Sequence, residues 1–557
     1  MKRDLNKLSS TEYDVVILGS GIYGLSTAWD AVLRGLKVAL IDKGDFMNAT
    51  SSNSLKVIHG GLRYLQHLDF RRMRESIHER TALMRIAPHL IHPLPVVMPT
   101  YGHALKGRFA MWAASLANDL IGFDRNKSND PHQYLPRGRL IPPEKLKEYV
   151  PGYDVHNFSG GVVWHDCQCY NTERLGLSYL LSAADAGADA ANYVECTAFL
   201  GDAQKVAGIQ AKDCFTGEIF DIRAKIVINA CGPWVDEVLR KAPKKNSGRR
   251  FLPSSAMNIV VRRKLLGSHA AGLPGPYVYR QEGGPVYRGN RILFFVPWRD
   301  TTIIGTDHRI YDGNPDDFFP DNMQVESFLD SVNRAYPSAD IKREEVSFIH
   351  KGLLPMAGAN VKTGEVKLEK RFRIHDHIHD DKTDGLITVV GVKYTTHRDV
   401  ANNIITLVLK KLGRTPPMCR TQDTPVYGGD IDRFEDFLKE SLRTSAFNEP
   451  ITRHLVYNYG SKYKDILSYT KADPFLGETV PGSAEVLKAE ILNGVRKEMA
   501  LKLSDVVLRR TDLGSAGNPG DAALRAAAEV MGGELRWDDR RIQKEIEETK
   551  ALYPPLN

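Results

Sequence analysis

The chain has 557 residues, of which 42% are hydrophobic and 26% charged, and its formal net charge is +7. Because domains have about 100–200 residues each, this length indicates roughly three domains, and the composition is that of globular cores, which excludes a disordered chain. The mild basic excess suits an anionic small molecule or an anionic membrane surface, although a solvated face of lysines and arginines explains it equally well. Nothing indicates a nucleic-acid partner.

The N-terminal residues, the apolar runs and the cysteines indicate where the protein is located in the cell. The first residues are basic but contain no apolar run, so no secretory signal is expected, and no segment reaches the ~18 apolar residues of a membrane span. Of six cysteines only Cys167 and Cys169 are close together, and their spacing is typical of neither a zinc site nor a thioredoxin motif. We therefore expect reduced thiols in a cytoplasmic protein. Peripheral attachment to the inner face of the cytoplasmic membrane stays open.

The first strong pattern predicts a βαβ unit. Residues 13–18 are a short, β-branched apolar run of the kind buried in parallel sheets. Residues 24–34 have helical character, and residues 37–41 predict a second strand. Similar apolar strands follow much later, at 224–230 and 385–390. We therefore expect one α/β domain of Rossmann type that is interrupted by insertions.

The other segments predict two further domains. Residues 253–307 alternate in the manner of antiparallel strands, which indicates a β-rich substrate domain. After residues 416–417 the periodicity is helical, so the C-terminal domain is expected to be all-α. The predicted boundaries are 1–85, 155–240 and 345–415 for the dinucleotide-binding domain, 86–154 and 241–344 for the substrate domain, and 425–557 for the helical domain.

The glycines after the first strand have the G-x-G-x-x-G spacing. Gly19 suits a tight turn, Gly21 a close approach to a pyrophosphate, and Gly24 close packing of helix on strand. Asp42 ends the next strand, where a carboxylate can bind ribose hydroxyls. This context predicts a dinucleotide site, and Asp42 argues against a 2′-phosphorylated ligand without separating NAD from FAD.

The following segment, residues 49–65, is polar, then glycine-rich, then cationic. It closely resembles the flavin-contacting segment of the FAD-dependent glycerol-3-phosphate dehydrogenase family. Further motifs that resemble the family follow in the same order at 229–234, 296–298 with 305–307, 391–396, 495–500 and 505–511. The resemblance implies an α/β fold with a discontinuous FAD-binding domain, a β-rich substrate domain and a C-terminal helical domain.

The same resemblance implies a function. The family oxidises the secondary alcohol of sn-glycerol 3-phosphate to the ketone by hydride transfer to flavin N5, and the electrons pass to a quinone or to oxygen. Some members are peripheral membrane enzymes. Residues 108–122 are apolar and helical, so contact with lipid stays open beside the default interpretation as a core helix. A homodimer also stays open.

Four residues are candidates for catalysis. His59 could accept the hydroxyl proton near neutral pH, or could be a structural histidine beside the cofactor. Arg63 and Tyr64 match family residues that face the substrate, and the planar guanidinium of Arg63 suits an anionic group. Lys393 lies in a loop that resembles the family's G-G-K-x-T-T motif, where its charge could stabilise reduced flavin or bind phosphate.

The candidates for FAD binding come from the fingerprint and from the resemblance. They are Gly19, Gly21, Gly24, Asp42, Lys43, Thr50, Ser51, Ser52, Lys56, Gly60, Gly61, Leu62, Val194, Gly232, Trp234, Gly391 and Thr396. No metal site is predicted, because the histidines of segment 374–379 do not have the spacing of a metal cage.

Three positions depart from the family pattern. Leu354 replaces an expected arginine, Asn258 stands in a changed stretch, and Lys370 aligns with part of an expected S-R pair. Each lost charge-assisted contact would weaken substrate binding about tenfold or more. Oxidation of a different polyol, sugar derivative or amine is therefore the alternative, and a flavin-binding protein without catalysis is a third hypothesis.

Overall fold

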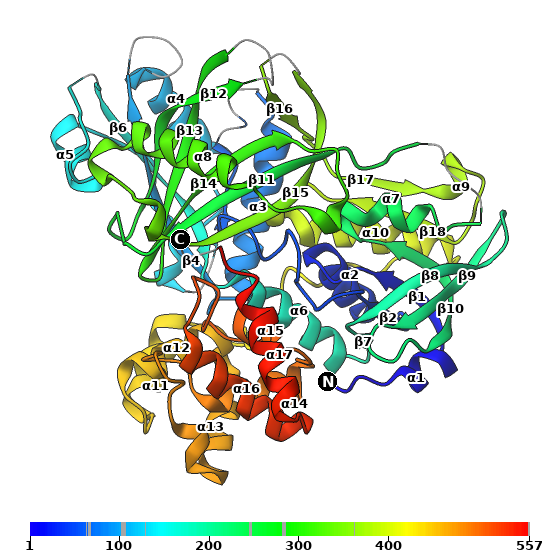
Figure 1. Ribbon diagram of the computed structural model, residues 1–557. Coiled ribbons are helices and arrows are strands. Elements are labelled where there is room, and N and C mark those ends of the chain that lie inside the picture. The colour runs from blue at the N-terminus through cyan, green and yellow to red at the C-terminus, as the bar shows by residue number, and fades with distance from the viewer. Residues whose placement is uncertain are drawn as a thin grey trace.

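The computed structural model describes residues 1–62, 64, 68–101, 107–127, 130–156, 158–243, 248–280, 286–360 and 363–554, without the side chains of 277–280, 286–288 and 380. Two β-sheets lie side by side in this structure, and a group of helices from the C-terminal part of the chain packs below them (Figure 1).

The smaller sheet contains the predicted βαβ unit. Its strands are β1 (Glu12–Leu18), β2 (Val38–Ile41), β7 (Asp189–Ala191), β8 (Val194–Gly201), β9 (Val206–Asp213), β10 (Ile219–Asn229), β17 (Arg373–Asp376) and β18 (Leu386–Val390). The order β18-β10-β1-β2-β7 is parallel throughout. β17 closes one edge in antiparallel fashion, and β8 and β9 form an antiparallel extension from β10.

The larger sheet is almost entirely antiparallel. Its strands are β3 (Val57–Ile58), β4 (Ile91–Thr100), β5 (Arg139–Ile141), β6 (Gly160–Cys169), β11 (Pro253–Val261), β12 (Ala270–Arg280), β13 (Val286–Trp298), β14 (Thr301–Ile310), β15 (Val346–Asn360) and β16 (Glu365–Leu368). The order is β16-β15-β11-β14-β13-β12-β4-β6-β3, with only β12 and β4 parallel. β6 and β15 lie inside segments predicted for the dinucleotide-binding domain, so the domain boundaries and the sheet boundaries do not coincide.

The helices before residue 412 cover the two sheets. They are α1 (Leu5–Ser10), α2 (Ile22–Leu33), α3 (Phe70–Ile86), α4 (Arg108–Ile121), α5 (Pro143–Tyr149), α6 (Thr172–Asp185), α7 (Val235–Leu239), α8 (Asn322–Ala335), α9 (His377–Asp380) and α10 (His397–Lys411). Side-chain caps fix several starts: Asp69 accepts a hydrogen bond from Arg72 N at α3, and Asn171 accepts one from Arg174 N at α6. α2, α6 and α10 pack together on one face of the parallel sheet, which buries that face.

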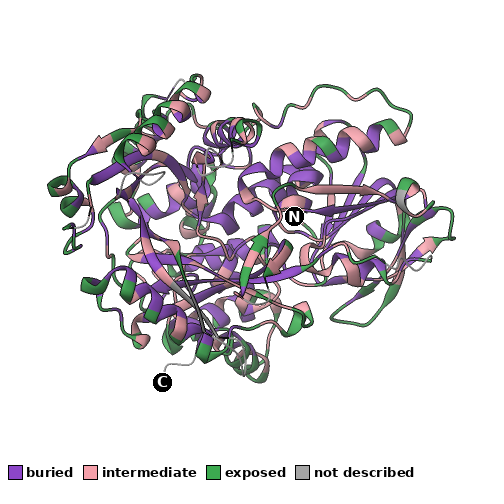
Figure 2. Cartoon of the chain, turned by 90° about the horizontal axis from the view of Figure 1, so that it is seen from above, coloured by how far each residue is buried: buried purple, intermediate pink, exposed green. Residues whose placement is uncertain are grey.

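The predicted all-α region is helical. It contains α11 (Phe434–Thr444), α12 (Glu449–Tyr459), α13 (Tyr463–Ala472), α14 (Lys488–Glu498), α15 (Leu503–Asp505), α16 (Asp521–Leu535) and α17 (Asp539–Lys550). A single π-helical turn, η10 (Val506–Arg510), follows α15 and carries two buried arginines toward the parallel sheet. The strands of both sheets are largely buried, whereas exposed residues gather on the outer helices (Figure 2).

One helix does not follow that pattern. In α4 only the polar residues Ser115 and Asn118 are buried, while Phe109 is 85% and Leu120 75% exposed. The default interpretation of this segment as a core helix is therefore wrong for its apolar face. Among the described residues, no helix combines the length and the apolar character that crossing a membrane requires.

Candidate active site

The glycine loop lies between β1 and α2, as the fingerprint predicts. Gly19 has φ +94°, which is a left-handed conformation that favours glycine. A Cβ on Gly24 would collide with the carbonyl oxygen of Gly19, so only glycine lets α2 pack this closely on the loop. Gly21 is the N-cap residue of α2 and supplies no side-chain cap. The N-terminus of α2 therefore has no cap from the side chain of its N-cap residue. Backbone N–H groups at such a helix start suit a pyrophosphate.

Three predicted residues surround this helix start. Ser51 Oγ accepts a hydrogen bond of 3.0 Å from Ile22 N. Asp42 Oδ2 accepts bonds from Ser20 N at 2.6 Å and Ser20 Oγ at 2.7 Å. Val194 N donates to Asp42 O at 2.7 Å, which places the start of β8 beside the carboxylate. Burial raises the pKa of Asp42, while its bonds from Ser20 oppose the rise. The structure thus brings Asp42, Ser51 and Val194 together at the carboxyl edge of the parallel sheet.

Lys43 and Trp234 also meet at this edge. The Lys43 ammonium lies 4.8 Å from the centre of the Trp234 ring. Both residues contact Asp316, which lies in the short helix η4 (Pro315–Asp317). Gly232 begins the turn η3 (Gly232–Trp234) in a left-handed conformation, φ +54°. These residues follow β2 and β10, the two neighbours of β1.

The predicted flavin segment connects the two sheets. Thr50 Oγ1 donates to Leu353 O of β15 and accepts from Leu353 N, each at 3.3 Å. Ser52 O accepts a bond from Lys56 Nζ at 3.3 Å. Lys56 is buried, and its ammonium also pairs with Glu173 at 2.9 Å. Lys56 therefore ties this segment to α6.

The next residues form the cluster around His59. Asp166 of β6 accepts a 2.6 Å bond from Gly60 N, directly after His59. The same carboxylate pairs with Arg80 at 2.8 Å and accepts from Trp164 Nε1 at 2.9 Å. Gly61 is left-handed at φ +85°, and Leu62 packs against the core of the larger sheet. Sequence reasoning missed Asp166 and Arg80, because neither belongs to a spaced motif.

His59, Tyr64 and Lys393 come together as predicted for one site. The rings of His59 and Tyr64 are 5.9 Å apart, and the Lys393 ammonium lies 4.1 Å from the centre of the Tyr64 ring. The Arg72 guanidinium lies 4.2 Å from the same ring. Arg63, the fourth catalytic candidate, lies outside the described residues.

The electrostatics of this cluster favour a neutral imidazole. Burial lowers the pKa of His59 to about 4, the Asp166 carboxylate opposes this, and the charges of Lys393, Arg80 and Arg72 add to it. Burial, followed by the charge of Arg72, lowers the pKa of Lys393 to about 7. At neutral pH the imidazole is therefore a free base, and the amine is close to its protonation midpoint.

Tyr23 positions the loop that carries Lys393. Its hydroxyl donates to Lys393 O at 2.6 Å and accepts from Val392 N at 3.1 Å and from Lys393 N at 3.0 Å. A Cβ on Gly391 would collide with the Tyr23 ring. Thr396 is buried at the start of α10. The predicted residues Gly391, Lys393 and Thr396 are thus held against α2.

A cavity of about 240 Å³ opens beside Lys393. Cationic side chains outnumber carboxylates five to two in its lining: Arg71, Arg72, Lys370, Arg371 and Lys393 against Glu75 and Asp399. Arg71 pairs with Glu75 at 3.1 Å. Among the described residues, Lys370 and Arg371 have no carboxylate partner within ion-pair distance. The cavity can therefore hold an anionic group.

Two departures from the family pattern have clear surroundings. Asn258 lies in β11 beside a bulge, and its Oδ1 accepts a 2.8 Å bond from Thr306 Oγ1. Leu354 lies in β15, opposite Ser254 of β11. Both are therefore in the larger sheet. Lys370, the third departure, lines the cationic cavity.

The comparisons with known proteins match this geometry. A family model for FAD-dependent oxidoreductases matches residues 14–392, and a model for the C-terminal domain of alpha-glycerophosphate oxidase matches residues 419–542. Glycerol-3-phosphate dehydrogenase of a Synechocystis strain is 32% identical over 98% of this chain and 97% of its own length. The chain belongs to the FAD-dependent glycerol-3-phosphate dehydrogenase family.

A second relative and a solved structure are similar over nearly the whole chain. The human mitochondrial glycerol-3-phosphate dehydrogenase is 32% identical over 98% of this chain and 74% of its own length. The crystal structure of the Bacillus halodurans glycerol-3-phosphate dehydrogenase, solved with FAD, has a TM-score of 0.73 at 24% identity and covers 98% of this chain and 95% of its own. The predicted family, the fold class with its Rossmann-type and helical domains, and the FAD cofactor are confirmed.

The residues present fit FAD. The glycine loop leads into the start of α2, where the N-cap Gly21 adds no side chain and Ser51 bonds Ile22 N. Asp42 stands at the carboxyl end of β2, where it can accept ribose hydroxyls. The protein is a flavin-dependent oxidoreductase that takes a small-molecule substrate and passes electrons to an acceptor.

Proposed function

We propose that the protein oxidises the secondary alcohol of sn-glycerol 3-phosphate to the ketone. The observation that carries this proposal is the cationic cavity next to the cluster of His59, Tyr64 and Lys393. A phosphorylated polyol needs an anion site beside a proton acceptor, and this chain has both within one site. FAD, when bound, supplies the hydride acceptor.

His59 takes the role of general base in this proposal. Its low pKa leaves the imidazole neutral at pH 7, so a ring nitrogen can accept the proton that leaves the substrate hydroxyl. Removal of this proton would favour loss of hydride from the substrate carbon, for which FAD would supply the acceptor. The nearby ammonium of Lys393 then stabilises negative charge in the site.

The phosphate is assigned to the cavity. Arg71, Arg72, Lys370 and Arg371 supply donors there, and two of these cations have no carboxylate partner among the described residues. Lys370 and Arg371, the two cations without a carboxylate partner among the described residues, replace the contact of the family's arginine at the position of Leu354. Hydrogen bonds to charged groups contribute about 1.5–3 kcal/mol each, so two such contacts offset the loss of one.

The cofactor roles predicted from the sequence are part of the proposal. The glycine loop and Ser51 would bind the pyrophosphate, and Asp42 the ribose, since these groups surround the start of α2. The segment from Thr50 to Leu62 and the loop of Gly391 would surround the flavin. Lys56 acts there by holding the segment on α6.

We further propose that the electron acceptor is a quinone, reached while α4 lies on the cytoplasmic membrane. The apolar side of α4 carries exposed Phe109, Trp112, Leu116 and Leu120, with Arg108 at its start, and exposed Phe123 follows its end. An amphipathic helix with this exposure can insert its apolar face at a lipid interface. Flotation with anionic vesicles tests this: the wild type should float, Phe109→Asp should not, and equal flotation of both would contradict the assignment.

Anaerobic mixing of the holoenzyme with sn-glycerol 3-phosphate tests the main proposal. Rapid bleaching of the oxidised flavin band at sub-millimolar substrate is expected. Arg371→Ala should weaken the apparent affinity for glycerol 3-phosphate about tenfold and leave reduction by glycerol unchanged. Arg525→Ala, at an exposed position of α16, should change neither. If dithionite but not glycerol 3-phosphate bleaches the flavin, the substrate is a different polyol, sugar derivative or amine.

A further inference from the structure

A segment of the substrate domain reaches across to the parallel sheet. Residues 311–319 connect β14 to α8 and are called the strap here. Most of the strap is exposed, and its tip is the short helix η4. No sequence motif marks this segment, and nothing in the proposed reaction uses it.

The tip of the strap is bonded to two predicted cofactor residues. The Lys43 ammonium donates to both carboxylate oxygens of Asp316, at 2.8 and 3.0 Å. Trp234 Nε1 donates to Asp316 Oδ1 at 2.9 Å. Because Lys43 also lies over the Trp234 ring, the three side chains form one closed contact.

The strand order shows where this contact lies. Lys43 follows β2 and Trp234 follows β10, while β1 with its glycine loop lies between them. In open α/β sheets the ligand binds in the crevice outside the carboxyl ends of such strands. A bond from Asp316 to both Lys43 and Trp234 therefore spans the crevice above the glycine loop.

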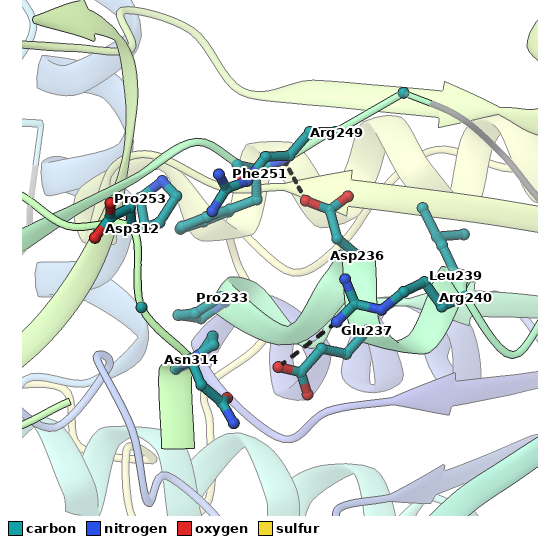
Figure 3. Close-up of a pocket in the computed structure, with 13 residues that line it drawn as sticks. Pro233, Asp236, Glu237, Leu239, Arg240, Arg249, Phe251, Pro253, Asp312 and Asn314 are labelled. Atoms are coloured by element: carbon teal, nitrogen blue, oxygen red, sulfur yellow. Dashed lines mark hydrogen bonds and ion pairs between the residues drawn. The ribbon is translucent and has the colours of Figure 1, made fainter. Parts of the chain in front are cut away.

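The strap is anchored at its ends and lightly packed along its length. Tyr311 and Phe318 meet edge to face with ring centres 5.0 Å apart and pack on the buried cluster of Val235 and Phe251. A cavity of about 580 Å³ lies between α7 and the first half of the strap, with Asn314 and Pro233 at its rim (Figure 3). The tip can therefore swing without disturbing the core that holds its ends.

We propose that the strap is part of the cofactor site and closes over the adenosine half of FAD, with Asp316 as the residue that holds it shut. Among the described residues, the side-chain bonds that hold the tip of the strap to the parallel sheet are an exposed ion pair and one indole hydrogen bond. The strap thus sets how fast FAD leaves. The proposal rests on the FAD site described above and not on the substrate, so a failure of glycerol 3-phosphate turnover would leave it standing.

The rate of FAD release from the holoenzyme tests the proposal. Release is followed by the rise in free flavin fluorescence after dilution. Asp316→Ala loses the ion pair and the indole bond, so release should be about 3- to 30-fold faster. Asp316→Asn keeps an acceptor for Trp234 and should accelerate release about 1.5- to 5-fold.

Asp317→Ala is the matched control. Asp317 is the adjacent exposed carboxylate, and its side chain forms no hydrogen bond or ion pair with the described residues. Its removal should leave release at the wild-type rate. Equal rates in the Asp316→Ala and Asp317→Ala variants, whether both fast or both unchanged, would overturn the role of Asp316.

A covalent cross-link between Lys43 and Asp316 should have the opposite effect on FAD release. A carbodiimide should join the Lys43 amine to the Asp316 carboxyl as an amide, which peptide mass spectrometry identifies. Coupled holoenzyme should release FAD at least tenfold more slowly, while the Asp316→Asn variant, which cannot couple there, should not slow. Release at the wild-type rate from coupled protein would refute the strap as a barrier.

Discussion

Asp45 connects the cofactor loop to the C-terminal helices through a buried charge cluster. It lies three residues after Asp42 and is fully buried. Arg510 donates to both its carboxylate oxygens, at 2.7 and 2.6 Å, and Arg509 Nε donates at 2.6 Å. Burial alone would raise the pKa of Asp45, but the charges of Arg510 and Arg509 lower it below its usual value. The carboxylate is therefore ionised and paired at every physiological pH.

Replacement of Asp45 by asparagine leaves the buried guanidinium of Arg510 without its carboxylate partner, while Arg509 keeps its ion pair with Asp505 at 2.7 Å. Removing one partner of a buried pair costs about 3–5 kcal/mol. A multidomain chain does not unfold in one step, so the expected effect is local opening of the helical domain. The opening constant should rise by a factor of roughly 10² to 10³·⁵, since each 1.4 kcal/mol is tenfold.

Amide hydrogen exchange of η10 and α15 measures this opening. The matched control is Glu534→Gln, because Arg496 also makes a two-bond contact with Glu534, at 2.9 and 2.7 Å, but on the surface. An exposed pair contributes little, so exchange in that variant should accelerate fivefold at most. Similar acceleration in Asp45→Asn and Glu534→Gln would refute the argument that burial makes the difference.

Three further outcomes are expected. Gly24→Ala should yield protein without flavin, measured as FAD per chain, because the methyl group collides with Gly19 O; full occupancy would contradict the packing argument. Lys393→Met should raise the KM for glycerol 3-phosphate at pH 6 and abolish the further rise expected above pH 7, where the lysine loses its charge; an unchanged KM profile would exclude its role. Burial opposes the charge of His454, but Glu490 and Asp512 raise its pKa to about 10. The charged His454 therefore stabilises the fold fully below about pH 6.5, and this contribution is lost as the pH rises toward 10. The melting temperature should fall over that pH range, and His454→Gln should flatten the dependence.

The sequence predicted the parallel sheet because its signals are local. A β-branched run followed by glycines specifies a buried strand and a tight turn wherever it occurs, as at β1 and β10. The sheet to which a strand belongs depends on distant partners. β6 and β15 lie in the larger sheet because β4 and β11 pair with them, and no periodicity within either segment encodes that choice.

Only those candidate site residues that belong to sequence motifs could be predicted. His59, Tyr64 and Lys393 meet in space because family-like segments carry them. Asp166 and Asp316 could not be foreseen, since an isolated aspartate has no signature until the chain brings donors to it. The apolar face of α4 was misjudged for a related reason: periodicity shows that a helix has two faces, but not which one meets the protein.

The discontinuous order of the parallel sheet has a consequence during synthesis. β1 is among the first strands made, yet its neighbour β10 and the next strand, β18, are made much later. At about 5–20 residues per second, the interval between Leu18 and Leu386 lasts on the order of 20–70 s. During that time the parallel sheet lacks β18, and for the first part of it β1 also lacks β10. We expect nascent chains shorter than about 390 residues to depend on chaperones and to be unable to capture flavin, so cofactor loading begins only when most of the protein has been translated.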